Sequence, residues 1–305
     1  MSIPLSRKTL LAASIEAAPG TAETLTAPEA AMNIFDAKME PTGNYVQIPS
    51  ATTFGVQPGS TGSRPGTCTF SMYLTSGAAV PLWASTFLPA CGIVFASTTG
   101  TATAESPGTN VKTVTLGLYE DGNLKMLRGA SGNAVFKFTA GEPVRIDFTF
   151  TGCWVAPTAA AMLAPTFPTA KPIRFASASM LFGAASPYWQ PRVKEFTLDL
   201  GNKVVLVPSQ TDSTGYAYAC ITERMTTGTM DPEAEIVSTR DVHGLWLAHA
   251  STVLAMDLGS SGNWFRVDIA SLDWSDAPAS GDRDGIRTET LKFNVCNDGL
   301  VFAFA

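Results

Sequence analysis

The side chains that most often carry chemistry are few in this sequence and lie far apart. The only two histidines, His243 and His249, are six residues apart and would lie on different faces of a helix, so we do not expect them to bind one metal ion. The five cysteines are Cys68, Cys91, Cys153, Cys220 and Cys296. Because their number is odd and they form no Cys-x-x-Cys motif, we expect neither a disulfide framework nor a zinc site, only reduced thiols.

Three carboxylates near the C-terminus are the remaining candidates for catalysis. Asp282, Asp284 and Glu289 could supply the paired acids of a glycosidase. The run Asp-Arg-Asp-Gly over 282–285 is more typical of a charged turn. The sequence contains no Gly-x-Ser-x-Gly motif, no Walker loop and no Gly-x-Gly-x-x-Gly placed between a strand and a helix. We therefore predict no catalytic residue, no cofactor and no bound metal.

Composition narrows the function classes further. The chain has 305 residues, of which 45% are hydrophobic and 15% charged, and its net charge is -6. Its charged fraction lies well below the ~25% of ordinary soluble domains. The hydrophobic content argues against disorder, and the negative charge argues against a protein that grips nucleic acid. So little charge suggests that partners cover much of the surface.

The sequence predicts neither export nor a membrane span. After Arg7 and Lys8, the apolar stretch is interrupted by Ser14 and ended by Glu16, which makes it too short and too polar for a signal peptide. No run approaches the ~18 apolar residues that a membrane-spanning helix needs.

Most of the local patterns predict strands. Period-2 alternation with β-branched or aromatic residues covers 113–119, 134–138, 144–150 and 288–295. Turn residues separate the first three of these at 120–123, 131–133 and 139–143. Alternation with one polar face favours antiparallel sheet.

Two segments have helical spacing. The first covers 78–91, with Pro81 in its first turn and Gly92 just past its end, and the second covers 241–251, capped by Asp241.

Proline, glycine and serine mark the connecting segments. The proline-rich stretch over 156–172 is typical of a linker, and 57–66 and 96–110 have the composition of flexible loops. The first fifty residues lack strong periodicity and are predicted to include an extended arm.

The chain also contains a weak internal repeat. Four matches follow the same order on both sides of the linker: 43–50 with 201–209, Cys68 with Cys220, 124–133 with 254–263, and 150–153 with 293–296. Together they predict the duplication of one β-rich unit of ~140 residues, with a first unit at 1–165 and a second at 166–305. If such a unit forms rings of six through head-to-tail contacts, three duplicated chains can form the same ring.

At the level of motifs, the sequence resembles the major tail tube protein of long, non-contractile-tailed bacteriophages. The resemblance lies in 6–11, 81–83, 90–92, 133–143, 148–152, 221–224, 231–233 and 282–286. It implies a mainly β protein made of two tandem tail-tube-like β-sandwich or barrel units. Each unit would carry a short flanking α-helix, and an extended N-terminal arm and long loops would mediate contacts between rings.

The function implied by the resemblance is that of a structural virion protein. It would be made in the host cytoplasm and would self-assemble into stacked rings that form the hollow tail tube. Tape measure, tail terminator and tail tip proteins would be its partners, and genomic DNA would pass through the lumen without specific binding. A neutral or acidic lining agrees with this, because it would not hold phosphates. The duplication favours a trimeric ring with pseudo-sixfold symmetry over a true hexamer, or over one tube unit joined to an unrelated decoration domain.

Two other classes of function stay open at this point. A β-sandwich module for carbohydrate binding or adhesion could use Trp189, Trp264 and Trp274 as sugar platforms, although burial is the commoner fate of tryptophan. A glycosidase is the weakest alternative, because no motif supports it.

Overall fold

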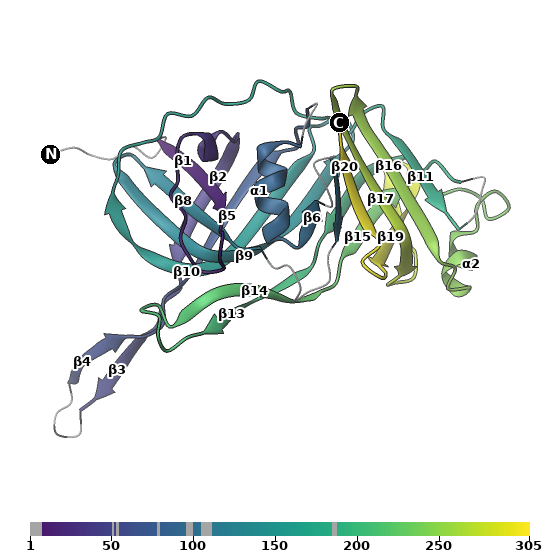
Figure 1. Ribbon diagram of the computed structural model, residues 1–305. Helices are drawn as coiled ribbons and strands as arrows, with labels where there is room; N and C mark the ends of the chain where they lie inside the picture. The colour runs from purple at the N-terminus through teal and green to yellow at the C-terminus, as the bar shows by residue number, and fades with distance from the viewer. Residues whose placement is uncertain are drawn as a thin grey trace.

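A computed structural model of the chain describes residues 8–50, 52, 55–77, 80–95, 100–104, 112–184 and 188–305 (Figure 1). The protein is mainly β. The strands before the linker are β1 (Thr9–Ile15), β2 (Ile34–Pro41), β3 (Tyr45–Pro49), β4 (Val56–Thr61), β5 (Pro65–Tyr73), β6 (Ile93–Phe95), β7 (Thr101–Ala104), β8 (Val114–Glu120), β9 (Asn123–Thr139) and β10 (Arg145–Ala159).

The strands after the linker are β11 (Ser179–Gly183), β12 (Val193–Asp199), β13 (Asn202–Pro208), β14 (Tyr216–Arg224), β15 (Thr227–Pro232), β16 (Thr252–Ser260), β17 (Asn263–Trp274), β18 (Ala279–Arg283), β19 (Ile286–Val295) and β20 (Leu300–Phe304). The α-helices are α1 (Leu82–Ala90) and α2 (Val242–Leu247), and Pro28–Ala30 forms a short 3-10 turn.

The part of the chain before the linker and the part after it pair their strands in the same order. Before the linker the neighbours run β1–β8–β9–β10–β5–β2, and after it they run β11–β16–β17–β19–β15–β12, with every pair antiparallel. A two-stranded hairpin lies at the same point in both, β3–β4 between β2 and β5 and β13–β14 between β12 and β15. We call these two parts the first and second halves.

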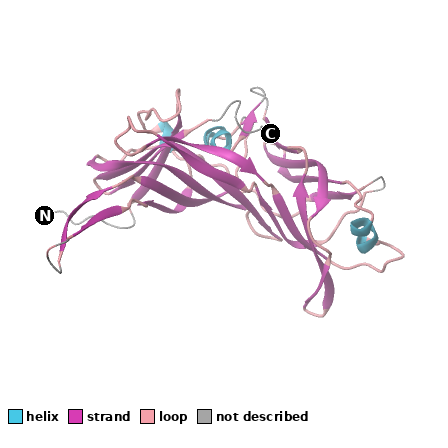
Figure 2. Ribbon diagram, turned by 90° about the horizontal axis from the view of Figure 1, so that it is seen from below, coloured by secondary structure: helices cyan, strands magenta, loops and turns pink. Residues whose placement is uncertain are grey.

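Two strand pairings join the halves into one sheet. β12 pairs with the end of β9, from Glu195 opposite Thr139 to Asp199 opposite Val135. β7, which comes from the first half, pairs with β20 of the second. Figure 2 shows the strands continuing from one half to the other in a curved arrangement. The largest hydrophobic cluster also contains residues of both halves.

Helix α1 is part of the core of the first half. Pro81 precedes its first residue, and Trp83, Phe87 and Leu88 are buried. The Phe87 ring lies 4.9 Å from that of Phe70 on β5. The helical prediction for this segment is confirmed over 82–90, whereas 78 and 79 lie outside the described residues.

Helix α2 is confirmed but shorter than predicted. The Asp241 side chain caps it, because the Gly244 N–H donates to Asp241 Oδ1 at 2.7 Å. His249, at a φ of 46°, has the left-handed backbone conformation that often follows a helix end, and β16 begins three residues later at Thr252.

Several loop predictions are wrong. The turn predicted at 131–133 lies inside β9, a strand of seventeen residues. The loop predicted at 57–66 consists mostly of β4 and the start of β5. The segment 96–110 contains β7, and its other residues except Gly100 lie outside the described part of the chain.

The prediction of an extended arm within the first fifty residues does not hold beyond residue 7, and 1–7 lie outside the described residues. β1 pairs with β8 along its whole length. Leu11, Ala12 and Ala13 are buried in it, so this segment belongs to the folded body. The linker predicted over 156–172 is confirmed in part. Its first four residues belong to β10, which ends at Ala159, and no strand follows until β11.

The strand pairing corrects three of the four repeat matches. Residues 43–50 and 201–209 do lead into equivalent hairpins. By contrast, 124–133 belongs to β9, whereas 254–260 belongs to β16, the counterpart of β8. The turns Gly122-Asn123 and Gly262-Asn263 are the equivalent positions there.

The cysteine matches are not equivalent either. Cys68 lies on β5 and Cys220 on the hairpin strand β14. Cys153 lies on β10, whereas Cys296 follows the end of β19. The short sequence matches therefore indicated that the two halves are related, but they did not identify the residues that are structurally equivalent.

Candidate assembly interfaces

The three carboxylates considered as candidates for catalysis lie at different points of the β18–β19 hairpin. Asp282 and Asp284 are exposed at the tip of the β18–β19 hairpin, where Asp282 Oδ1 accepts the Gly285 N–H at 3.3 Å, so the predicted charged turn is confirmed. Glu289 lies further along β19, where its Oε1 is 3.7 Å from His243 Nε2. Within the described ranges, no group of three or more His, Cys, Asp or Glu could hold a metal ion.

All five cysteines are free thiols. Burial raises the pKa of Cys68 to about 12 and raises those of Cys91 and Cys153 as well. A thiol protonated at neutral pH is a poor nucleophile, so these three side chains act as small buried hydrophobic groups.

Two of the three tryptophans proposed as sugar platforms are buried. Trp189 and Trp274 are 7% and 6% exposed and both contact the edge of Phe182, with ring centroids 6.1 and 5.8 Å away. Trp264 is half-buried. The expectation of burial is therefore confirmed for Trp189 and Trp274, which are core residues and cannot serve the alternative of an aromatic platform.

The joint between the halves is an edge-to-edge strand pairing with one buried apolar face, where Phe138 packs on Phe196 at a centroid distance of 5.1 Å, and with a polar network at its end. Asn133 on β9 donates from Nδ2 to Asp199 Oδ1 at 2.7 Å and accepts the Asn202 N–H at 3.0 Å. Asn202 in turn donates from Nδ2 to the carbonyls of Cys91, at 2.7 Å, and Gly132, at 3.0 Å. These bonds fix the point where the chain leaves β12 and enters the β13–β14 hairpin.

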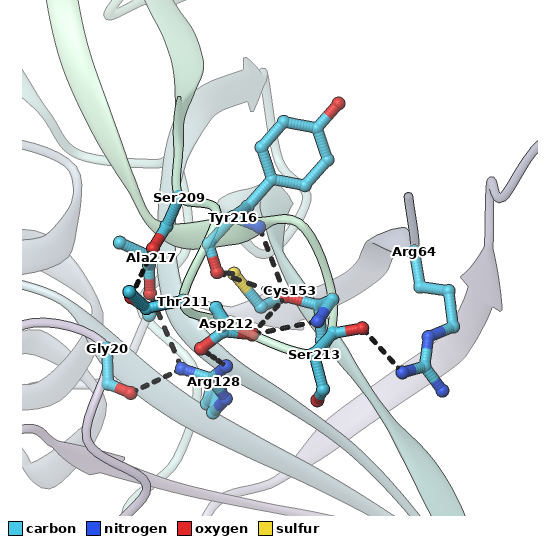
Figure 3. Close-up of polar contacts among 12 residues, drawn as sticks. Gly20, Arg64, Arg128, Cys153, Ser209, Thr211, Asp212, Ser213, Tyr216 and Ala217 are labelled. Atoms are coloured by element: carbon cyan, nitrogen blue, oxygen red, sulfur yellow. Dashed lines mark hydrogen bonds and ion pairs between the residues drawn. The ribbon is translucent and has the colours of Figure 1, made fainter. Parts of the chain in front are cut away.

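Hairpin β13–β14 folds back onto the first half and is clamped there by Arg128 of β9 (Figure 3). Arg128 Nη1 donates to the Gly20 carbonyl at 2.6 Å and to that of Ala217 at 3.4 Å, while Nη2 pairs with Asp212 at the hairpin tip. Beside this clamp, the Cys153 thiol donates to the Tyr216 carbonyl at 3.4 Å.

A buried carboxylate supports the clamp from the other side. Glu16 is 3% exposed and accepts four hydrogen bonds. Its donors are the backbone N–H groups of Gly20 (2.7 Å) and Gly129 (2.6 Å) and the hydroxyls of Thr113 (2.6 Å) and Thr115 (2.8 Å). Glu16 therefore holds the loop whose Gly20 carbonyl receives Arg128. In the sequence, Glu16 is recognisable only as the residue that ends an apolar stretch, and its role as a buried acceptor is not predicted.

The charge of Asp212 is stabilised in the folded protein. Burial by itself raises the pKa of this carboxyl, but hydrogen bonds from the Thr214 N–H and hydroxyl and from Arg128 outweigh it, so the pKa lies below its usual value. Arg64, at the start of β5, adds a bond from Nη2 to the neighbouring Ser213 carbonyl at 2.7 Å.

Hairpin β3–β4 has no comparable support. It forms a separate two-stranded sheet that projects away from the body in Figure 1, and nearly all of its residues are exposed. Tyr45, Val46, Ile48 and Val56 are 59%, 55%, 47% and 64% exposed. Because an isolated two-stranded hairpin is marginally stable in water, a projecting apolar one indicates an interaction surface.

No helix in the described ranges is both long and apolar enough to cross a membrane. A search of curated proteins found no match to the chain. A scan against protein families gave a match to the family described as phage tail tube protein, over residues 6–295.

The match covers nearly the whole sequence, and the mainly β fold agrees with a structural role. The chain belongs to the phage tail tube protein family and is a structural component of the virion.

Proposed function

We propose that three copies of this chain close into a ring of six equivalent units, and that such rings stack into the tube of a long, non-contractile tail. The observation that carries this proposal is the shared strand order of the two halves, together with their edge-to-edge joint at β9 and β12. Units of the same topology joined edge to edge form a head-to-tail contact, and such contacts close into rings when the rotation per step allows it.

We further propose that the halves, at about 1–165 and 166–305, are the products of an internal duplication. Two equivalent units in one chain would halve the number of chains needed for a six-unit ring. The shared strand order supports this reading over one tube unit joined to an unrelated decoration domain.

DNA would pass through the lumen during ejection without specific binding. The net charge of -6 supports this, because a surface without a basic excess does not retain phosphates. Tape measure, terminator and tip proteins would bind the ring faces and the ends of the tube.

Light scattering after size-exclusion chromatography, combined with negative-stain electron microscopy over a rising concentration series, tests the proposal. We expect particles of three times the 32.1 kDa chain mass and ring images with six lobes. Rings of six chains would overturn the trimer, and chains that stay monomeric at the highest concentration would overturn self-assembly. A monomer that binds immobilised glycans would instead support the adhesion alternative.

A further inference from the structure

We propose that neighbouring copies of the chain join at a surface that repeats the internal β9–β12 joint, with Lys38 of one copy paired to Asp273 of the next. This inference rests on the proposed ring and assigns its contact residues. It follows from one row of residues in each half, where a row is a series of residues that lie opposite one another on neighbouring strands.

The row in the first half runs through four strands. Asn133 on β9 lies opposite Thr149 on β10. Thr149 lies opposite Thr69 on β5, and Thr69 lies opposite Lys38 on β2. The row therefore begins at Asn133 and ends at Lys38, which is exposed on an edge strand.

The row in the second half runs through the counterpart strands. Asp273 on β17 lies opposite Asn294 on β19. Asn294 lies opposite Thr227 on β15, and Thr227 lies opposite Asp199 on β12. Asn133 and Asp273 each lie ten residues after the equivalent turn residues Asn123 and Asn263, so Asp273 is the counterpart of Asn133 and, at the other end of the row, Asp199 is the counterpart of Lys38.

Inside the chain, the two rows meet where Asn133 donates to Asp199 at 2.7 Å. The outer ends of the combined row are Lys38 and Asp273, both exposed. In the described ranges, neither side chain takes part in an ion pair, whereas the nearby Asp276 is paired with Lys292 at 3.2 Å. If the joint is repeated between copies, Lys38 of the next copy occupies the place of Asp199 beside Asp273. The two ends carry opposite charges, which is the complementarity that such a contact needs.

The backbone at both ends is arranged for the same contact. At the internal joint, the Leu200 N–H donates to the Ala134 carbonyl at 3.1 Å. Met39, next to Lys38, is the counterpart of Leu200, and both side chains are buried. In the second half, Trp274 takes the place of Ala134.

The Trp274 carbonyl is directed away from β19, toward the edge of β17 where the pairing with β16 ends at Thr252 opposite Leu272. The Ser275 N–H donates to the Lys292 carbonyl at 3.1 Å, and the alternation of an antiparallel ladder then turns the Trp274 backbone away from β19. Within the described residues, β2 pairs only with β5, so its other edge is also available. The Met39 N–H of one copy would therefore donate to the Trp274 carbonyl of the next.

Charge-reversal variants of the full chain test this joint. Lys38→Asp places two carboxylates together, and we expect the concentration at which half of the chains are in rings to rise at least about tenfold. The double variant Lys38→Asp with Asp273→Asn recreates the internal Asn133–Asp199 pair between copies and is expected to restore ring formation. Lys171→Asp, an exposed lysine in the linker, is the matched control.

Ring formation is measured by light scattering and electron microscopy, and thermal melting by circular dichroism checks that each monomer is folded. The proposed joint is contradicted if Lys38→Asp assembles like Lys171→Asp, or if the folded double variant fails to restore rings. Neither result would contradict the proposed ring itself. If the unaltered chain forms no rings, the proposed function fails and the joint fails with it.

Discussion

The two hairpins of this protein occupy the same place in the strand order but have opposite surroundings. Both are antiparallel, with Tyr45 opposite Thr61 at the start of β3–β4 and Asn202 opposite Arg224 at the start of β13–β14. β13–β14 lies on the first half and is held by Arg128, whereas β3–β4 projects into solvent. The comparison shows that the same hairpin is supported by packing on another unit in one half and lacks that support in the other. Under the proposed ring, the neighbour of the first half is the second half of another copy.

The most direct test of this comparison is to shorten each hairpin to a tight turn and to compare the losses in the free energy of unfolding. Replacing 204–221 removes the buried Ala219 and Ile221 together with the clamp, and we expect the free energy of unfolding to fall by about 4 kcal/mol. Replacing 46–60 in the same way is expected to change it by less than about 0.5 kcal/mol, because nearly all of the described residues in this range are exposed. Urea unfolding of the monomer measures both. Equal losses would show that β3–β4 also supports its own half.

The next largest effect is expected at the carboxylate beneath the clamped hairpin. Glu16→Ala leaves four buried donors without an acceptor, and we expect a loss of about 3 kcal/mol in the free energy of unfolding. Glu142→Ala, at an exposed turn, is the control and is expected to be nearly neutral. A Glu16→Ala protein as stable as this control would contradict the role of Glu16.

The clamp itself can be removed while its packing is kept. Arg128→Met preserves the apolar stem but loses the bonds to Gly20, Ala217 and Asp212, and we expect about 2 kcal/mol of destabilisation, measured by urea unfolding. Arg192→Met is the matched control, because the Arg192 side chain is 86% exposed and its ion pair with Glu233 should contribute little. Similar losses in the two variants would mean that the clamp does not hold β13–β14.

The smallest expected effect is a dependence on pH. The pKa of Asp212 is lowered by folding, so its stabilising contribution is complete above the unfolded pKa of about 4 and is lost as the pH falls through the lower folded value. We expect the stability difference between the unaltered protein and Asp212→Asn, on the order of 1 kcal/mol at pH 7, to shrink in acid. A difference that stays constant from pH 7 to pH 2 would show that Asp212 is not responsible.

The segments that local pattern predicted well are strands rich in β-branched and apolar residues. The strand expected over 288–295 is found at Ile286–Val295, and the one expected over 113–119 at Val114–Glu120. Composition wrongly predicted a turn or a loop where a strand contains residues that are typical of turns. Gly132 lies in β9 because the Phe150 ring occupies the space of a side chain there, and β4 is exposed and carries no alternation.

The sequence by itself determined the class of protein, strand segments within β8, β9, β10 and β19, and both helices, because periodicity and capping depend on residues that are close together in the chain. Only the tertiary structure decided the register of the two halves, the partners of Glu16, and the row that ends at Lys38 and Asp273. These depend on strand pairings between residues up to about a hundred positions apart, and no short sequence match carries that information. The physical reason is that a β-sheet is held together by contacts across the chain, so its interfaces exist only once it is folded.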